Sequence, residues 1–264
     1  MISICIPVFN DSKYIRKCVE SIIAQTYTDW ECIICDDKST DNTLECIPED
    51  PRIRVYKNEK NLGCGLNRRK CIELAKGDWF VFIDGDDYVK SDYLETLIKN
   101  SKDVDIVWTS APCSGIKTGL EMYKYATENW LYFTCWGKLW SRKVVSSKTY
   151  SKLKLCEDVA TNCYWMTTAK KVKCIQEEFY TYTRYGDNNS IAPNMFNVLN
   201  HIYALYENML CSIKNNMKDK AVIFNNAILN QYWPLIKKHM NTQLDKTLGK
   251  VIISCIEFKS LILD

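Results

Sequence analysis

Three aspartates stand almost side by side at the end of an apolar segment. Residues 79–83 read Trp-Phe-Val-Phe-Ile, and Asp84, Gly85, Asp86 and Asp87 follow directly. Carboxylates this close repel one another at neutral pH, and a hard divalent cation between them relieves that repulsion. The glycine lets another molecule approach the backbone. The segment therefore favours a cation site, and its other interpretation is a polar turn after a strand.

A second apolar segment also stops at paired carboxylates. Residues 32–35 precede Asp36 and Asp37, and the hydroxyl residues after them could cap a helix over 40–47. In open α/β sheets, ligands bind beyond the carboxyl ends of the strands. We therefore expect both acidic segments to face one crevice. One acid pair could hold a metal, and the other could accept hydrogen bonds from a nucleobase or from ribose hydroxyls.

The composition is that of a globular protein. The 264 residues are 47% hydrophobic and 25% charged, which suits one large domain or two closely packed halves. There is no run of eighteen apolar residues, and the first residues lack the features of a signal peptide. Fourteen scattered cysteines fit buried, reduced thiols. We therefore expect a cytoplasmic protein without a membrane span.

The net charge of +3 is unevenly distributed. Residues 109–156 carry eight basic and two acidic side chains, whereas residues 1–108 carry 15 basic and 20 acidic ones. The middle segment is also rich in aromatic residues. It is either a solvated basic face or a surface for an anionic acceptor or an anionic membrane.

The order of elements predicts a parallel sheet. Residues 2–108 alternate strand patterns with helix patterns, which is typical of right-handed βαβ units. The predicted strands are 2–7, 30–36, 53–57, 79–84 and 104–108, and the predicted helices are 12–25, 40–47, 64–76 and 91–100.

The second half of the chain is less regular. We expect short strands near 171–176 and 178–184, followed by helices over 195–215, 218–239 and 244–263. These last helices could pack onto the sheet, form a homodimer interface or lie on a membrane surface as a peripheral anchor.

Five segments together resemble the family 2 inverting glycosyltransferases of the GT-A fold, in particular those that build bacterial surface polysaccharide. The segments are Ile4 to Asn10, Ser21 to Tyr27, Asp36 to Asn42, Asn61 to Arg68, and Asp84 to Asp87. The resemblance implies a GT-A, Rossmann-like α/β fold, with a mostly parallel central sheet flanked by helices and a helical C-terminal extension. It implies a nucleotide-sugar-binding half over 1–108, an acceptor-binding half over 109–194 and the extension over 195–264.

The resemblance also implies a donor site and a metal. The donor would be a nucleotide-sugar, by preference a UDP-sugar, and Asp86 with Asp84 would hold Mn²⁺ or Mg²⁺. Such an ion neutralises the diphosphate leaving group. The donor-binding residues carried over are Pro7, Phe9, Asn10, Asp36, Asp37, Arg68, Asp84, Gly85, Lys138 and Arg184. The chain departs from the family pattern at Arg69 and Cys71, which leaves the base preference open beyond a lean to uracil.

The acceptor half is similar to the family at a Glu-Asp pair. By resemblance, Asp158 is the general base that deprotonates the acceptor hydroxyl, and Glu157 is a supporting acid. The other interpretation is an acidic first helical turn. Trp136 could stack on an acceptor sugar, or it could pack in the core.

The sequence therefore predicts a metal-dependent inverting glycosyltransferase whose acceptor is a lipid-linked or surface glycan. The enzyme would be cytoplasmic, with peripheral contact to the inner face of the membrane as one arrangement. Two alternatives stand beside this prediction. One is transfer to hydroxylated bases of nucleic acid, for which the basic aromatic segment leaves room. The other is a non-catalytic nucleotide-sugar binder, and the intact acidic segments argue against it.

Overall fold

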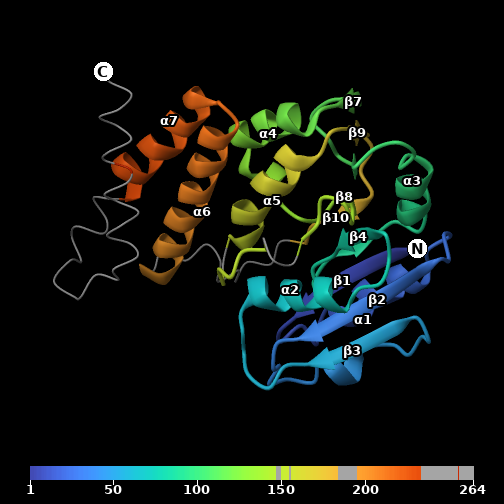
Figure 1. Ribbon diagram of the computed structural model, residues 1–264. Helices are drawn as coiled ribbons and strands as arrows, with labels where there is room; N and C mark the ends of the chain where they lie inside the picture. Colours follow the sequence, from blue (N-terminus) through green and yellow to red (C-terminus); the bar gives the residue numbers. More distant parts are fainter. Residues whose placement is uncertain (147–149, 155, 184–194, 233–254, 256–264) are drawn as a thin grey trace.

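A mixed β-sheet forms the centre of the protein in the computed structural model (Figure 1). The structure describes residues 1–146, 150–154, 156–183, 195–232 and 255. Within that part of the chain, the sheet has eight strands in the order β3-β2-β1-β4-β8-β6-β9-β7. A small antiparallel pair, β5 (Tyr88–Val89) and β10 (Tyr180–Thr181), lies beside it.

The first half of the sheet is parallel. Strands β1 (Ile2–Val8), β2 (Trp30–Asp36), β3 (Ile53–Lys57) and β4 (Trp79–Phe82) all pair in parallel. Strands β1 and β2 are buried along their whole length. This is typical of parallel strands, because both faces of a parallel sheet are covered. This half agrees closely with the predicted strands, and the prediction of an α/β fold with a mostly parallel sheet is confirmed.

The second half of the sheet is mixed. Strand β8 (Lys138–Ser141) lies antiparallel between β4 and β6 (Ile106–Trp108). Strand β9 (Val172–Cys174) pairs in parallel with β6, and β7 (Gly115–Lys117) pairs antiparallel with β9. Because β8 follows β6 in the chain but pairs with β4, residues from both halves of the chain form one continuous sheet.

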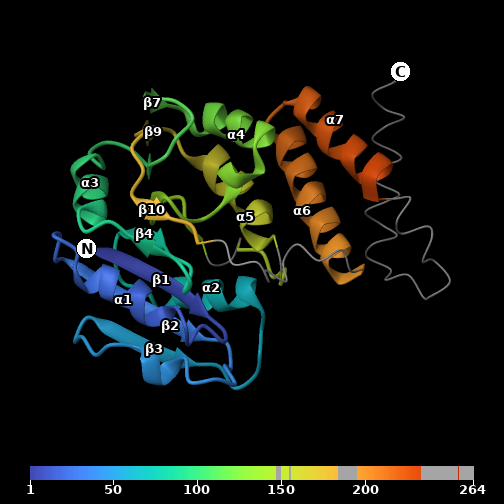
Figure 2. The ribbon, with the colours of Figure 1, turned by 180° about the vertical axis from the view of Figure 1, so that it is seen from behind.

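Helices cover both faces of the sheet (Figures 1 and 2). Helices α1 (Ile15–Ile23) and α3 (Tyr93–Lys99) pack on one face, with the core residues that include Ile4, Val81 and Leu139. Helices α2 (Cys64–Leu74), α4 (Gly119–Glu128) and α5 (Glu157–Thr168) pack on the other, with Phe80, Phe82 and Trp140. The short 3₁₀ segment η2 (Trp130–Phe133) connects α4 to β8.

The C-terminal helices extend the second face. Helix α6 (Met195–Lys214) packs on α5, and α7 (Lys218–Ala227), continued by η4 (Ile228–Tyr232), packs on α6. Buried hydrogen bonds fix this packing, since the Asn208 amide donates to the carbonyl of Val159 at 3.0 Å. The predicted helix over 218–239 is described only to residue 232, and the one over 244–263 lies outside the described residues except for Cys255. In the described part of the chain, no helix has the length and apolarity needed to cross a membrane.

The predicted helix over 40–47 is wrong. In its place is a single 3₁₀ turn, η1 (Leu44–Cys46). Ser39, which with Thr40 was expected to cap the helix, instead accepts a hydrogen bond from the N–H of Asn10 after β1 at 2.9 Å. The Thr43 hydroxyl likewise accepts from the N–H of Asp11 at 2.8 Å. Side-chain bonds of this kind compete with helix formation. The segment therefore ties the ends of β1 and β2 together.

Candidate active site

The two acidic segments lie at the same edge of the sheet. Asp36 is the last residue of β2, and Asp84 follows β4 by two residues. Strand β1 lies between β2 and β4, so its C-terminal end separates the two acidic segments. The topology thus confirms that both segments reach one edge, where α/β proteins bind ligands.

Asp37 organises the loop that leads into α2. One carboxylate oxygen accepts hydrogen bonds from the Asn58 amide at 2.9 Å and from the Leu62 N–H at 2.8 Å, and the other accepts from the Gly63 N–H at 2.7 Å. The side chain of Asp36 is fully buried and accepts from the Ser39 N–H at 3.2 Å. Both carboxylates therefore shape the predicted nucleobase site by binding backbone N–H groups. Their direct contact with a nucleobase stays a prediction.

The end of β1 offers an exposed ring beside these acids. Pro7 is buried in the strand, whereas the side chain of Phe9 is 46% exposed. Asn10 has a left-handed backbone, with φ of 59°, and its side-chain oxygen accepts from the Thr40 N–H at 2.8 Å. This turn presents Phe9 at the sheet edge, where an aromatic face can stack on a base.

A further carboxylate, Asp11, lies against the segment from Asp84 to Asp87. It was not predicted from the sequence. Burial, together with the charges of Asp86 and Asp84, raises the pKa of Asp11 to about 7. A Cβ added to Gly85 would lie 2.8 Å from the Asp11 carboxylate, so glycine is what allows this approach. Asp11 follows the Pro-Val-Phe-Asn segment directly, which was the only signal in the sequence that could have pointed to it.

The carboxylates of this segment have different environments. Burial, followed by the charge of Asp84, raises the pKa of Asp86. Asp87 is buried, and its two oxygens accept from the Tyr180 hydroxyl at 2.6 Å and from the Thr183 N–H at 2.7 Å. Burial raises the pKa of Asp87 to about 7. Asp87 is therefore bound within the protein, whereas Asp86 is half-buried among like charges.

These residues fit a divalent cation that is completed by a ligand. Within the described part of the chain, no three His, Cys, Asp or Glu side chains are grouped so that they could hold a metal by themselves. Mg²⁺ is commonly bound by one or two carboxylates together with substrate phosphates. The raised pKa of Asp86 beside Asp84 shows negative charge that a cation would stabilise.

Arg68 connects the two predicted halves of the site. Its guanidinium forms ion pairs with Asp84 and with Glu157, the first residue of α5. The Arg68 side chain is only 7% exposed. The fold therefore brings together three predicted parts of the site: the donor contact Arg68, the metal ligand Asp84 and the Glu-Asp pair.

The Glu-Asp pair has the protonation properties of an acid–base site. Burial raises the pKa of Glu157 to about 7, and the Arg68 charge opposes this shift. Burial also raises the pKa of Asp158, again opposed by Arg68. Asp158 is half-buried. A half-buried carboxylate with a raised pKa is suited to accept a proton near neutral pH.

Lys138 lies close enough to Asp158 for its charge to lower the pKa of that carboxyl, whereas Trp136 packs on two tyrosines. The Lys138 ammonium is buried, donates to the carbonyl of Thr134 at 2.7 Å and lies 4.3 Å from the centre of the Trp108 ring. Burial lowers the pKa of Lys138 to about 7. The Trp136 ring stacks on Tyr180 and Tyr182. Arg184 lies outside the described residues.

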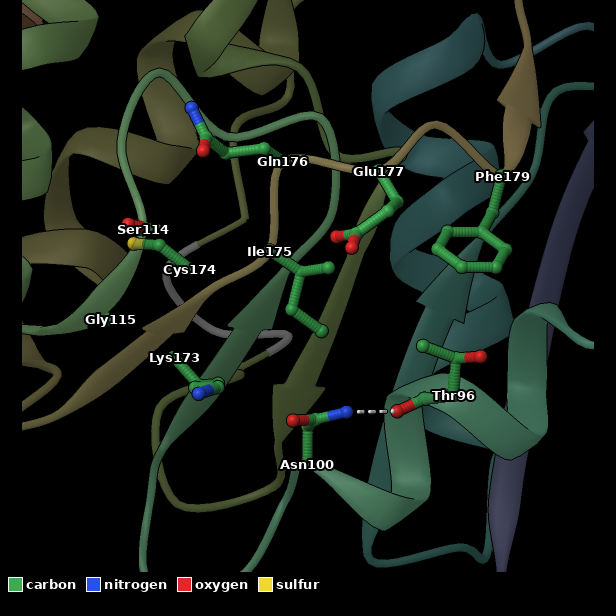
Figure 3. A pocket seen from close by; sticks show the side chains of 10 residues that line it. All are labelled: Thr96, Asn100, Ser114, Gly115, Lys173, Cys174, Ile175, Gln176, Glu177 and Phe179. Atoms are coloured by element: carbon green, nitrogen blue, oxygen red, sulfur yellow. Dashed lines mark hydrogen bonds between the residues drawn. The ribbon is translucent and has the colours of Figure 1, made fainter.

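A separate pocket of about 410 Å³ opens between α3 and β9 (Figure 3). Its wall includes Thr96 and Asn100 from α3, Lys173 from β9, and Glu177 and Phe179 from the connection to β10. None of the predicted site residues lines it. The pocket is therefore distinct from the site built around Asp84 and Glu157.

Comparison with known proteins decides the family. Residues 3–172 match the family model described as Glycosyl transferase family 2. This chain belongs to glycosyl transferase family 2. A stretch of 113 residues is 39% identical to glycosyltransferase GlyG of Streptococcus pneumoniae serotype 4 and covers 40% of this chain and 38% of GlyG. Another similar member is the putative teichuronic acid biosynthesis glycosyltransferase TuaG of Bacillus subtilis, 28% identical over 207 residues, which cover 73% of this chain and 77% of TuaG.

Some similar proteins are longer. The chondroitin synthase of Escherichia coli is 42% identical over 102 residues, which are 37% of this chain and 15% of the synthase. This chain thus spans well under half of GlyG and of chondroitin synthase.

Two solved structures share the fold. S. aureus TarS in complex with UDP-GlcNAc superposes with a TM-score of 0.68 at 17% identity, and the match covers 97% of this chain and 80% of TarS. The mannosyltransferase PcManGT from Pyrobaculum calidifontis, in complex with GDP-Man and Mn²⁺, gives a TM-score of 0.58 at 11% identity over 98% of this chain and 86% of the other. The GT-A fold expected from the sequence is confirmed.

Proposed function

We propose that this protein transfers a glycosyl group from a nucleotide-sugar to a hydroxyl acceptor, with inversion at the anomeric carbon. One observation carries the proposal: Arg68 pairs with Asp84 of the acidic segment and with Glu157, the neighbour of Asp158. The residues suited to a diphosphate and the residue suited to a proton therefore meet at one place.

The donor side is proposed to bind a UDP-sugar. TarS is described in complex with UDP-GlcNAc, which supports a uridine donor in a protein of the same fold. Phe9 would stack on the base, with Pro7, Asn10, Asp36 and Asp37 shaping the site around it. Gly85 would let the diphosphate approach the backbone.

We further propose that Asp86 and Asp84 hold Mn²⁺ or Mg²⁺. Such a cation neutralises the diphosphate as it leaves. The complex of PcManGT with GDP-Man and Mn²⁺ supports this assignment by analogy of fold.

Asp158 is proposed as the general base. The acceptor oxygen attacks the anomeric carbon from the side opposite the diphosphate, its proton passes to an Asp158 carboxylate oxygen, and the bond between carbon and diphosphate oxygen breaks. Glu157 and Arg68 would hold α5 so that Asp158 faces the acceptor hydroxyl. Such a base contributes about 10²- to 10⁴-fold to the rate.

The proposed acceptor is a lipid-linked or surface glycan. The name of TuaG, which refers to teichuronic acid biosynthesis, supports a polysaccharide product. Cytoplasmic location with peripheral contact to the inner membrane face belongs to the same proposal. Transfer to nucleic acid is less well supported, because Lys138 of the basic segment is buried and Arg142 donates to the carbonyls of Gly77 at 2.6 Å and Ala75 at 2.9 Å.

Thermal denaturation against a panel of nucleotide-sugars, with and without Mn²⁺, tests the donor side. A true donor raises the melting temperature in proportion to the logarithm of its concentration above Kd. Asp86→Asn should abolish the part of the shift that needs Mn²⁺, and Asp219→Asn, an exposed aspartate on α7, should keep it. A wild-type protein that no nucleotide-sugar stabilises would contradict the proposal.

Transfer assays test the base. Asp158→Asn should keep the donor-induced shift and lose about 10²-fold or more of the transfer rate. A non-catalytic binder would show the shift without turnover, and a full rate in Asp158→Asn would assign the base elsewhere. The anomeric configuration of one product decides between inversion and retention.

A further inference from the structure

Three aromatic rings stack beside the acidic segment. The Trp136 ring lies 4.9 Å from the Tyr180 ring between centroids, with planes 11° apart, and 5.6 Å from the Tyr182 ring, with planes 16° apart. Tyr180 is 3% exposed, whereas Tyr182 is 41% exposed. One end of the stack is therefore buried and the other end reaches the surface.

The geometry of an extended chain explains how the rings fit. Alternate residues of a strand point to one side and lie about 6.8 Å apart. This is close to twice the contact distance of about 3.5 Å between carbon atoms. One ring stacked on both Tyr180 and Tyr182 fits this spacing, so Trp136 supports Tyr182, which stays 41% exposed.

Asp87 holds this arrangement on both sides of Tyr182. Its oxygens accept from the Tyr180 hydroxyl at 2.6 Å and from the Thr183 N–H at 2.7 Å. The Tyr180 hydroxyl also accepts from the backbone N–H of Asp84 at 3.1 Å. The exposed ring is therefore fixed relative to the residues proposed to hold the metal and the diphosphate.

We infer that Tyr182 is an acceptor subsite that binds the apolar face of a sugar ring. This inference rests on the proposed function and deepens it, because it assigns a residue that would bind the glycan acceptor. An exposed aromatic ring held rigid by a stack loses little conformational entropy on binding. A planar base could also stack on such a ring. The proposed base site, however, lies at the ends of β1 and β2, whereas Tyr182 follows β10, which pairs with β5 just after Asp87.

Saturation-transfer NMR with two simple probes tests the inference. Methyl β-D-glucopyranoside and methyl N-acetyl-β-D-glucosaminide both present an apolar face of axial C–H groups. We expect the wild-type protein to saturate these protons, and Tyr182→Phe to do the same because the ring is kept. Tyr182→Ala should weaken the apparent affinity by about fivefold to tenfold, as lost aromatic stacking predicts. Tyr125→Ala removes a tyrosine on α4 that is 37% exposed; it is the matched control and should behave like the wild type.

The outcomes separate this inference from the proposed function. Equal saturation in Tyr182→Ala and wild type, or no saturation of either probe by the wild type, would overturn the subsite. Stronger binding of nucleosides than of both glycosides at Tyr182 would overturn it as well. The nucleotide-sugar thermal shift should be the same in Tyr182→Ala and wild type. Loss of that shift in the wild type would instead contradict the proposed function.

Discussion

Arg68 on α2 and Glu157 at the start of α5 form a buried ion pair, and Asp84 shares the same guanidinium. The side chains of Arg68 and Glu157 are 7% and 5% exposed. Because both charges are removed from water, each depends on the other for stabilisation. The ion pair connects α2 to α5, the helix that carries the proposed general base Asp158.

Removal of Arg68 should destabilise the fold and misplace the base. Arg68→Ala leaves Glu157 buried without its cation, which should cost about 3–5 kcal/mol of unfolding free energy. Urea denaturation measures this loss. In a double-mutant cycle, Arg68→Ala with Glu157→Gln should lose less than the sum of the single variants, because both remove the same interaction. Additive losses would mean that the pair does not act as one unit.

Asp36 and Asp37 should respond differently to neutralisation. Asp37→Asn keeps one acceptor oxygen but places an NH₂ group against N–H donors of Leu62 or Gly63, which should cost about 1–3 kcal/mol. The loop into α2 should then be exposed to proteolysis. Asp36→Asn disturbs one backbone contact, to Ser39, and should cost less. Denaturation of both variants in parallel measures the difference, and equal losses would contradict the role given to Asp37.

The sequence predicted the edge of the sheet but not what surrounds it. Apolar runs that stop at Asp36 and Asp84 locate two strand ends, since strand periodicity and acidic ends are local features. Asp11 and the stack on Trp136 depend on which strands become neighbours. Asp11 meets Asp84 and Asp86 because β1 pairs with β4. Trp136 meets Tyr182 because β8, which follows Trp136, pairs with β4, while β10 pairs with β5, the strand after β4. Tertiary pairings of this kind leave no pattern in a single sequence.

Stability should depend on pH through Lys138. Its pKa falls from its ordinary value of 10.5 to about 7 because the ammonium is buried. Below pH 7 both the folded and the unfolded chain hold the proton, and between pH 7 and 10.5 the unfolded chain holds more. The Lys138 contribution to stability therefore rises with pH across this window, by at most about 1.4 kcal/mol per pH unit.

Comparison with Lys138→Met isolates this contribution. Urea denaturation between pH 7 and pH 9 should show the wild type gaining stability relative to the variant as the pH rises. Lys143→Met, an exposed lysine two residues after β8, is the control and should follow the wild type. A constant difference between Lys138→Met and wild type would show that the ammonium does not change its protonation in this range.

Gly65→Ala should separate α2 from the segment before α5. An added Cβ at Gly65 would overlap the carbonyl oxygen of Leu153 and lie 2.7 Å from that of Ser151. These are backbone atoms, so the chain between them must shift, and overpacking of this kind costs about 1–3 kcal/mol. Since the same segment leads into Glu157 and Asp158, transfer should fall while the donor-induced thermal shift is kept. Glu73→Ala, on the exposed face of the same helix, should change neither measurement. A Gly65→Ala protein with wild-type transfer would show that the approach of α2 to this segment is not what positions Asp158.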